Sequence, residues 1–345
     1  MVKRILCGLT ADEVLEMTEP FGFNSTHSVS ITNNLYKRKI SDYKHFVKLP
    51  NKLRDLLEEI SVPGTYPPVS YEISIDRSVK YLFRTDAGME FETVFIPEHN
   101  RNTVCVSSQS GCRMGCSFCA TGNFGFRGNL TTGDIINQII SIPHSEKITH
   151  VVFMGMGEPM DNLESVLKAC KILISEWGLA LGSKNITVSS VGKMPELEKF
   201  LHQSECNLAF SLYSPFTDER LNAIPSEKKN PASKILDILK GYPVRKKRRF
   251  SVAYVMIRGI NDSDKHLEEL KSILKDSALR VNLLPYHSAL NNNHQSSTAE
   301  KMQYFKHSLT LSGISTSIRK SRGNDISAAC GLLAIDLEAG KNRHP

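Results

Sequence analysis

The pattern of hydrophobic and polar positions changes along the chain. From residue 103 onward, short apolar runs typical of buried strands alternate with longer stretches in which apolar residues recur at helical spacing. Strands are predicted at 103–107, 148–154, 185–190, 207–214, 250–257 and 280–286, with a further one at 315–320. Helices are predicted near 133–142, 162–176, 195–203, 232–240, 263–275 and 298–311.

This alternation predicts an α/β fold. Strands that are joined by single helices form parallel sheets with right-handed crossovers. The strand–helix units are too few for a closed eight-unit barrel, so we expect an open, partial (β/α)6 barrel. The last helix should begin at a capping box formed by Ser297 and Glu300 and should end at Gly313.

The first 88 residues follow a different pattern. Short amphipathic helical stretches at 44–49 and 52–57 are separated by prolines, and strand-like alternation follows at 69–76 and 79–85. We expect a small N-terminal accessory domain that leads into a hairpin. The expected division is an accessory domain at 1–88, the barrel at 89–325 and a C-terminal tail at 326–345.

Composition excludes several classes of protein. The 345 residues are 40% hydrophobic and 23% charged, with 21 Gly and 15 Pro, unlike collagen, a coiled-coil rod or a disordered chain. No apolar stretch approaches the roughly 18 residues of a membrane span. The N-terminus has no apolar core of an export signal. We therefore expect a cytoplasmic protein with no membrane partner.

The chain is also basic. Its 43 Lys and Arg outnumber its 36 Asp and Glu, which gives a net charge of +7, and cations cluster at 37–39, 245–249 and 319–322. Any one of these runs is compatible with a solvated surface. Three runs on a basic chain favour a polyanionic partner, and we expect a nucleic acid.

The eight cysteines divide into groups. Cys112, Cys116 and Cys119 form a Cys-x3-Cys-x2-Cys run just after the first predicted barrel strand. Structural zinc needs four ligands and a disulfide would leave one thiol over, whereas three thiolates suit a 4Fe–4S cluster with one iron left free. Phe118 would shield such a cluster from water. The three scattered cysteines are interpreted as packing residues: Cys7, Cys170 and Cys206.

Longer motifs make the sequence similar to a known family. The cysteine run resembles the signature of radical S-adenosylmethionine (SAM) enzymes. The segments 105–112, 154–159, 259–263 and 322–331 resemble, in the same order, those of the RlmN/Cfr family of radical methyltransferases, which methylate adenine carbons in RNA. The resemblance extends from Glu92 to Cys330 and is weaker in the N-terminal region. It implies that the N-terminal region contacts RNA.

The resemblance implies a cofactor site at the carboxyl ends of the barrel strands. A 4Fe–4S cluster would be held by Cys112, Cys116 and Cys119, and its free iron would chelate SAM. Taken alone, the segment 154–159 would be a glycine turn with an exposed acid. Ser189 and Ser211 alone would not indicate a binding site. Within the family pattern, the residues that contact SAM are Gly157, Glu158, Ser189, Ser211, Leu212, Tyr213 and His287.

The resemblance also implies catalytic roles for Glu92, Cys105 and Cys330. One SAM methylates the thiolate of Cys330, and a second is cleaved to a 5′-deoxyadenosyl radical that takes hydrogen from the S-methyl group. The methylene radical then adds to the adenine ring, whose amidine carbon is electrophilic and cannot be methylated by ordinary displacement. Glu92 accepts the ring proton, and Cys105 releases the RNA by closing a disulfide with Cys330. Without the resemblance, either cysteine would be a packing residue and Glu92 a solvent-facing one.

Details of the sequence indicate the branch and the partners. Tyr213, His287 and the segment 223–226 depart from the common family pattern, which puts single cofactor contacts in doubt. The segments 158–162 and 322–325 are closer to the RlmN branch, which implies methylation of adenine carbon 2 rather than carbon 8. The implied partners are 23S rRNA, tRNA and an electron donor such as flavodoxin or ferredoxin, and the implied state is a monomer.

Two other classes of function stay open at this stage. A metal-stabilised RNA-binding protein without turnover would explain the basic runs and the cysteine run, but it would leave Cys105, Cys330 and Glu158 without a role. A radical enzyme that acts on a peptide or a small molecule would not need the basic surface or Cys330.

Overall fold

The computed structural model describes residues 3–243, 248–288 and 294–334. Its centre is a sheet in the strand order β14-β13-β12-β11-β10-β9-β6-β5-β4-β3. Every neighbouring pair from β6 to β14 is parallel, and the sheet stays open because β14 and β3 are its two edges. The expected open, partial barrel is confirmed. Its parallel strands are β6 (Thr103–Cys105), β9 (His150–Phe153), β10 (Ile186–Ser190), β11 (Asn207–Ser211), β12 (Phe250–Met256), β13 (Arg280–Pro285) and β14 (Thr316–Ile318).

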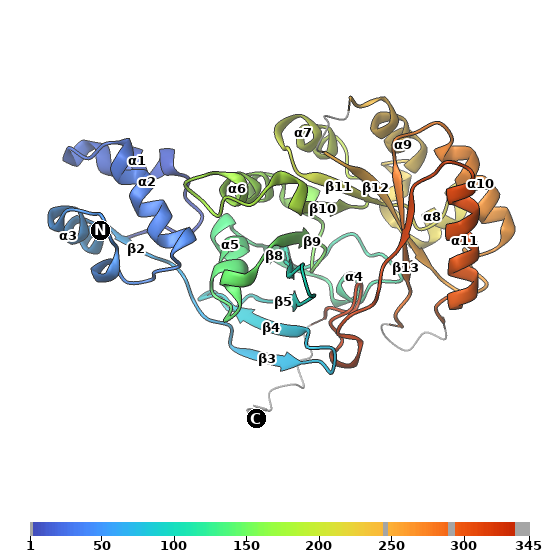
Figure 1. The fold of residues 1–345 in the computed structure, drawn as a ribbon, viewed down its shortest axis with the longest axis horizontal. Coiled ribbons are helices and arrows are strands. Elements are labelled where there is room, and N and C mark those ends of the chain that lie inside the picture. Colours follow the sequence, from blue (N-terminus) through green and yellow to red (C-terminus); the bar gives the residue numbers. More distant parts are fainter. Residues whose placement is uncertain (1–2, 244–247, 289–293, 335–345) are drawn as a thin grey trace.

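Helices cross over between successive parallel strands and cover the outer face of the sheet (Figure 1). Their apolar stripes bury residues such as Ile135, Leu173 and Phe200 against the strands. The last helix begins one residue later than its capping box predicts: its N-cap is Thr298, whose side chain accepts from the Lys301 N–H. The main helices are α5 (Thr132–Ile140), α6 (Leu163–Ile174), α7 (Glu196–Gln203), α9 (Ala232–Gly241), α10 (Asp264–Leu274) and α11 (Ala299–Leu311).

The hairpin expected in the N-terminal region belongs to the same sheet. β3 (Ser70–Ile73), β4 (Val79–Arg84) and β5 (Glu90–Ile96) are antiparallel to one another, and β5 pairs with β6. The division expected after residue 88 therefore falls inside one continuous sheet. The sequence pattern suggested two domains here because antiparallel strands interrupt the strand–helix alternation.

The remaining N-terminal residues form a separate lobe at one end of the molecule (Figure 1). It contains α1 (Ala11–Thr18), α2 (Ser25–Thr32), α3 (Asn51–Ile60) and a two-stranded parallel sheet of β1 (Arg4–Ile5) and β2 (Ser61–Val62). Pro50 starts α3, which buries Leu53 and Leu57 one turn apart. Tyr66 attaches the lobe to α5 through a 2.6 Å hydrogen bond from its hydroxyl to Asp134.

Among the elements that were not predicted from the sequence, four short ones lie around the site. They are β7 (Gln109–Gly111), α4 (Ala120–Phe124), β8 (Phe126–Asn129) and α8 (Thr217–Ala223), each too short for its periodicity to be recognised. Three of them frame the cysteine run, since β7 precedes it and pairs with β8, and α4 follows it. Over the described part of the chain, no helix combines the length and the apolar character that crossing a membrane requires.

Candidate active site

The cysteine run lies on a tight loop between β7 and α4. Cys112 follows Gly111, where a Cβ atom would come within 1.7 Å of the Gly125 carbonyl oxygen, so only glycine fits there. The Cys112 N–H donates to that same carbonyl at 3.0 Å, and the Cys119 N–H donates to the Cys116 carbonyl at 3.1 Å. The loop therefore holds the three cysteines by main-chain hydrogen bonds.

The three thiols are close enough to influence one another. Burial raises the pKa of Cys112 to about 12, and the neighbouring Cys119 contributes to that rise. Burial also raises the pKa of Cys116, and Cys119 and Cys112 add to the effect. No group of three His, Cys, Asp or Glu in the described residues is arranged to hold a single metal ion. A 4Fe–4S cluster bonds its thiolates through different irons, so its three ligands need not converge on one point.

Apolar side chains surround this loop. The rings of Phe118 and Tyr213 are stacked, with centroids 5.0 Å apart and planes at 15°. Cys116 and Tyr213 belong to a small second core with Ile224 and Tyr286, apart from the main core of the sheet. The shielding role expected for Phe118 thus involves a partner that lies almost a hundred residues away, at the end of β11.

Glu158 lies at the carboxyl end of β9, where a cofactor contact was expected. Its side chain is buried, and its two oxygens accept from the N–H groups of Met160 at 3.0 Å and Val191 at 2.9 Å. Burial raises its pKa. The carboxylate therefore already joins the ends of β9 and β10, and a ligand ammonium would have to use its remaining lone pairs.

The glycines beside Glu158 allow two segments of the protein to pack closely. A Cβ at Gly157, which has φ +96°, would lie 2.5 Å from Gln109 Cβ, and one at Gly155 would lie 2.7 Å from Ser107 Oγ. These close neighbours give both glycines a packing reason that does not depend on a ligand. They let the end of β9 lie against the segment that enters the cysteine loop. The SAM contact predicted for Gly157 stays a prediction.

Asp161 fastens this strand end to the cysteine loop, a role that the sequence did not indicate. Its carboxylate accepts from Arg113 Nε at 2.9 Å, Lys193 Nζ at 2.7 Å and Gln109 Nε2 at 2.9 Å. Arg113 belongs to the cysteine loop and Lys193 follows β10. One buried carboxylate therefore connects three separate strand ends.

The next two strand ends carry the expected polar residues. Ser189 Oγ of β10 and Ser211 Oγ of β11 lie 3.4 Å apart, so the structure brings these two residues together. Leu212 is fully buried, and Tyr213 adopts a left-handed backbone conformation with φ +67°. The Tyr213 carbonyl accepts from Asn261 Nδ2 at 2.7 Å, which stabilises this conformation.

Arg220 of α8 supports the same strand ends. It is fully buried, pairs with Glu227 at 2.6 Å and donates to the carbonyl oxygens of Ser211, Leu212 and Val191. A buried arginine that satisfies three carbonyls and one carboxylate fixes the backbone of β10 and β11 relative to each other. No sequence signal distinguished it from a surface arginine on a helix.

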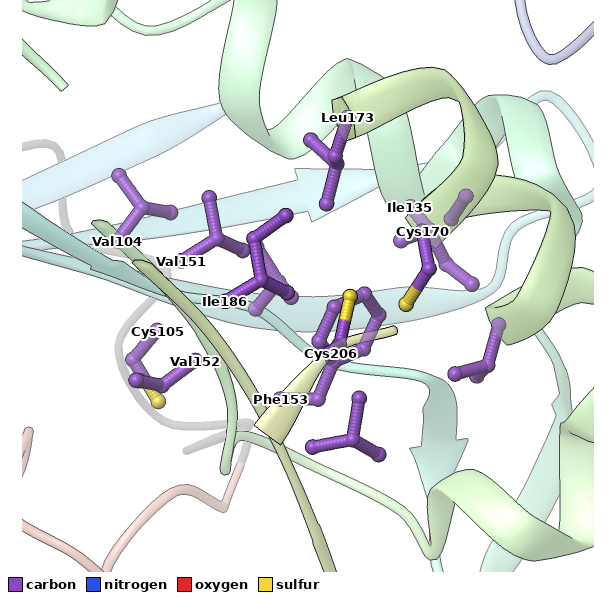
Figure 2. Packing of buried hydrophobic residues seen from close by; sticks show 14 of the residues in the cluster. Val104, Cys105, Ile135, Val151, Val152, Phe153, Cys170, Leu173, Ile186 and Cys206 are labelled. Carbon is purple, nitrogen blue, oxygen red and sulfur yellow. The ribbon is translucent and has the colours of Figure 1, made fainter. Parts of the chain in front are cut away.

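Cys105 ends β6 and points away from the main helical core. It pairs in register with Val152, and both side chains lie on the opposite side of the sheet from Val104, Val151 and Ile186 (Figure 2). Burial raises the pKa of the Cys105 thiol to about 12, and Cys330 contributes to the rise. Cys170 is different, because it lies in the buried core between helix and sheet, as expected for a packing residue.

The segment that carries Cys330 is attached at both ends. The Gly323 N–H donates to Asp76 at 2.9 Å, and Asp325 accepts from Ser74 Oγ at 2.6 Å. At the other end, the Gly331 carbonyl accepts from the Ala120 N–H at 2.8 Å, directly after the cysteine loop. The segment is therefore docked on the β3–β4 turn and on α4.

Cys105 and Cys330 line one cavity of about 410 Å³. The Cys330 thiol is exposed to solvent, yet the surrounding protein raises its pKa, an effect that Arg319 opposes. His287 lines the same cavity and is 2.6 Å from Ser321 Oγ. All eight cysteines are free in this structure.

The charge inside this cavity is strongly positive. Among the described residues, its lining includes four cationic side chains and one acidic side chain, Glu98, which pairs with Arg322 at 3.7 Å. The run at 319–322 thus faces the two cysteines. The cations of the lining are Arg101, Arg319, Lys320 and Arg322.

The other two basic runs have different surroundings. In the run at 245–249, residues 245–247 lie outside the described part of the chain. Arg248 points inward, because it donates to the carbonyls of Cys206 at 2.9 Å and Leu201 at 2.7 Å. In the run at 37–39, burial lowers the pKa of Lys39.

Glu92 lies on β5, one strand beyond Cys105, and is buried rather than solvent-facing. Val94 pairs in register with Cys105, and Glu92 is two residues away on the same strand, so their side chains share a face of the sheet. Glu92 Oε1 forms an ion pair with Lys80 Nζ at 3.4 Å.

Comparison with known proteins places this arrangement in context. Residues 106–270 match the model of the Radical SAM superfamily. The chain is 43% identical to the probable dual-specificity RNA methyltransferase RlmN of Phocaeicola vulgatus, over 96% of this chain and 95% of that protein. It is 36% identical to the dual-specificity RNA methyltransferase RlmN of Geobacter sulfurreducens, over 97% and 93%. A crystal structure of a radical SAM methyltransferase from Sphaerobacter thermophilus has a TM-score of 0.88 at 35% identity, covering 95% of this chain and 98% of the other.

Proposed function

Because the chain belongs to the RlmN family of radical SAM RNA methyltransferases, we propose that it methylates carbon 2 of an adenine in 23S rRNA and of the adenine beside tRNA anticodons. The observation that carries this proposal is the cavity that Cys105 and Cys330 share. The two residues lie 225 positions apart in the sequence, and the fold brings both to the lining of this cavity.

The family uses a 4Fe–4S cluster and SAM. We propose that Cys112, Cys116 and Cys119 hold the cluster and that the strand ends beside it bind SAM. When bound, these groups supply a radical that can remove a hydrogen atom from a methyl group. The SAM-binding residues are then Gly157, Glu158, Ser189, Ser211, Leu212 and Tyr213, with His287 at the cavity.

Cys330 provides the group that carries the methyl. Its thiolate displaces the methyl from the sulfonium of one SAM, so that the Cys330 S–C bond forms and S-adenosylhomocysteine leaves. Arg319 favours the thiolate, since its positive charge opposes the rise in the Cys330 pKa. After hydrogen removal, the methylene on Cys330 bonds to the adenine ring and ties the protein to the RNA.

Release of the RNA requires a base and a second thiol. The ring adduct loses one electron, for which the cluster held by Cys112, Cys116 and Cys119 would be the acceptor, and Glu92 accepts the ring proton. The Cys105 thiolate then attacks the Cys330 sulfur and breaks its bond to the methylene, which takes up a proton to become the methyl group, and a Cys105–Cys330 disulfide remains. An external thiol then restores the two cysteines by thiol–disulfide exchange. The electron donor, such as flavodoxin or ferredoxin, has a separate role, which is to reduce the cluster. This disulfide is proposed only as a transient state of turnover, and both cysteines are free in the structure.

The cations of the cavity support an RNA substrate. Four of them lie around the two reacting cysteines with a single acid among them, a balance that suits the phosphates on either side of a target nucleotide. A peptide or small-molecule substrate would not require it. We propose that the protein acts as a monomer in the cytoplasm, where both RNA substrates occur.

Mass spectrometry of nucleosides tests the proposed function. Anaerobically reconstituted protein with SAM and a reductant should convert adenosine in 23S rRNA fragments and in tRNA to 2-methyladenosine. Formation of 8-methyladenosine would show instead that the enzyme methylates carbon 8 of the adenine. A colourless zinc protein that produces neither nucleoside would instead support the alternative of a non-catalytic RNA-binding protein.

Salt dependence provides a prediction for the cavity cations. If Arg322 contacts a phosphate, RNA affinity should decrease steeply with salt in the wild type, and Arg322→Met should reduce the slope of log affinity against log salt by about 0.7–1. Lys271→Met on α10 is the matched control, since Lys271 pairs with Glu268 on that helix and lies outside the cavity. An unchanged slope for Arg322→Met would mean that this run is only a solvated surface.

A further inference from the structure

Lys80 occupies a position that the reaction described so far does not use. It lies on β4, and its side chain is 11% exposed although it carries an ammonium group. It contacts two carboxylates, Glu92 Oε1 at 3.4 Å and Glu72 Oε2 at 3.5 Å. Because an isolated buried ammonium is costly, a lysine in this place must be compensated by its partners.

The strand register explains how the three side chains meet. Glu72 of β3 is directly opposite Lys80 of β4, and Lys80 is opposite Val94 of β5. Glu92 is two residues from Val94, so its side chain and that of Lys80 lie on the same face of the sheet. The side chain of Glu72 is 46% exposed and that of Glu92 is 5% exposed, so Lys80 lies between a solvent-facing acid and a buried one.

Deprotonation of the adenine ring requires the ionised form of Glu92. A carboxylate with a side chain 5% exposed receives little help from water, and burial favours its neutral form. A cation in contact with it favours the ionised form and also fixes the direction in which the carboxylate points.

We propose that Lys80 is a positioning residue for the release step: it keeps Glu92 ionised and oriented toward the face of the sheet that carries Cys105. Glu72 holds Lys80 from the other side. This inference rests on the proposed role of Glu92 and adds a residue to it. Lys80 itself touches neither RNA nor SAM in this account.

Comparison of Lys80→Met and Lys80→Arg tests the inference. Lys80→Met should still methylate Cys330 and attack RNA, but release should slow by about 10- to 100-fold. This is less than the roughly 10²- to 10⁴-fold that a general base contributes, because Glu92 itself is retained. The protein should therefore accumulate as a covalent RNA species that survives denaturation. Lys80→Arg keeps the positive charge and should restore release to within about threefold of the wild type, because the proposed role depends on that charge.

Two folding controls separate a positioning role of Lys80 from a structural one. Iron content and Cys330 methylation report folding, and both should match the wild type in Lys80→Met. Equal loss of Cys330 methylation and RNA attack in both Lys80 variants would overturn the inference, and so would normal release by Lys80→Met. Glu72→Gln, which removes only the exposed partner, should slow release less than Lys80→Met.

Glu92→Gln in parallel distinguishes the two levels of the proposal. If Glu92→Gln traps the adduct and Lys80→Met does not, the deprotonation role stands and the inference about Lys80 fails. If Glu92→Gln releases RNA normally, the proposed role of Glu92 is wrong and the inference fails with it.

Discussion

A Cys330→Ala enzyme is expected to transfer no methyl group to RNA while retaining its cluster. Cys330 is exposed within the cavity and is not among the three cysteines of the β7–α4 loop, so its thiol can be removed without disturbing them. Alanine leaves no sulfur to accept the methyl. Iron should bind normally, SAM should be cleaved only in an abortive manner, and methylated adenosine should be absent from the RNA.

Cys170→Ala is the matched control for this substitution. Cys170 is buried in the core between α6 and the sheet (Figure 2), and it does not line the cavity. Its loss should lower stability by about 1 kcal/mol and leave methyl transfer intact. A Cys330→Ala enzyme that still methylates RNA would end the proposed mechanism, whereas loss of iron from it would indicate that Cys330 has a structural role in the loop.

Replacement of Cys105 should cause the covalent protein–RNA intermediate to accumulate, whereas replacement of Cys330 should prevent it from forming. Cys105→Ala retains Cys330, Glu92 and the cavity cations, so the variant can methylate Cys330 and attack RNA. It has no thiol with which to displace the methylene from the Cys330 sulfur. The protein should accumulate as a protein–RNA species that migrates as one band under denaturing conditions and is shortened by nuclease.

Cys206→Ala should show no such species, because Cys206 is a core cysteine away from the cavity (Figure 2). Normal turnover by Cys105→Ala would remove the resolving role from Cys105. If both cysteines were packing residues, both variants would show only a modest loss of stability and no adduct.

The barrel could be predicted because its signal is local. Each parallel strand is a short apolar run between polar turns, and each crossover helix has an apolar stripe with its own period. The predicted strands and helices coincide with β6 and β9 to β14 and with the main helices. The place of the hairpin could not be predicted, since an antiparallel strand can pair equally well with another hairpin or with a barrel edge.

The residues that support the site could not be predicted, because their partners lie far along the chain. Arg220 and Asp161 have ordinary sequence surroundings, and their roles depend on carbonyls and side chains from several strand ends. The proposed role of Lys80 could not be predicted either, because only the strand register places it beside Glu72 and Glu92. The packing reason for Gly157 was also not predictable, because its close neighbour Gln109 belongs to a separate strand, β7.

The cysteine run and the chemistry at Cys330 were accessible from the sequence for a different reason. Their spacing and neighbours form motifs that few other functions need, so the resemblance could be recognised before any geometry was known. The structure adds that a segment of small residues is docked rather than loose, through contacts to Asp76 and Ala120.

Peptide mapping of the Cys105→Ala protein after reaction with RNA tests the central claim most directly. After protease and nuclease digestion, the account predicts one peptide that contains Cys330 and carries an adenine nucleotide joined through a methylene group on its sulfur. With SAM that carries a deuterated methyl group, that methylene should retain two deuterium atoms, because one is removed as the radical forms. A nucleotide attached to another residue, or an unmodified Cys330 peptide alongside methylated RNA, would contradict the account.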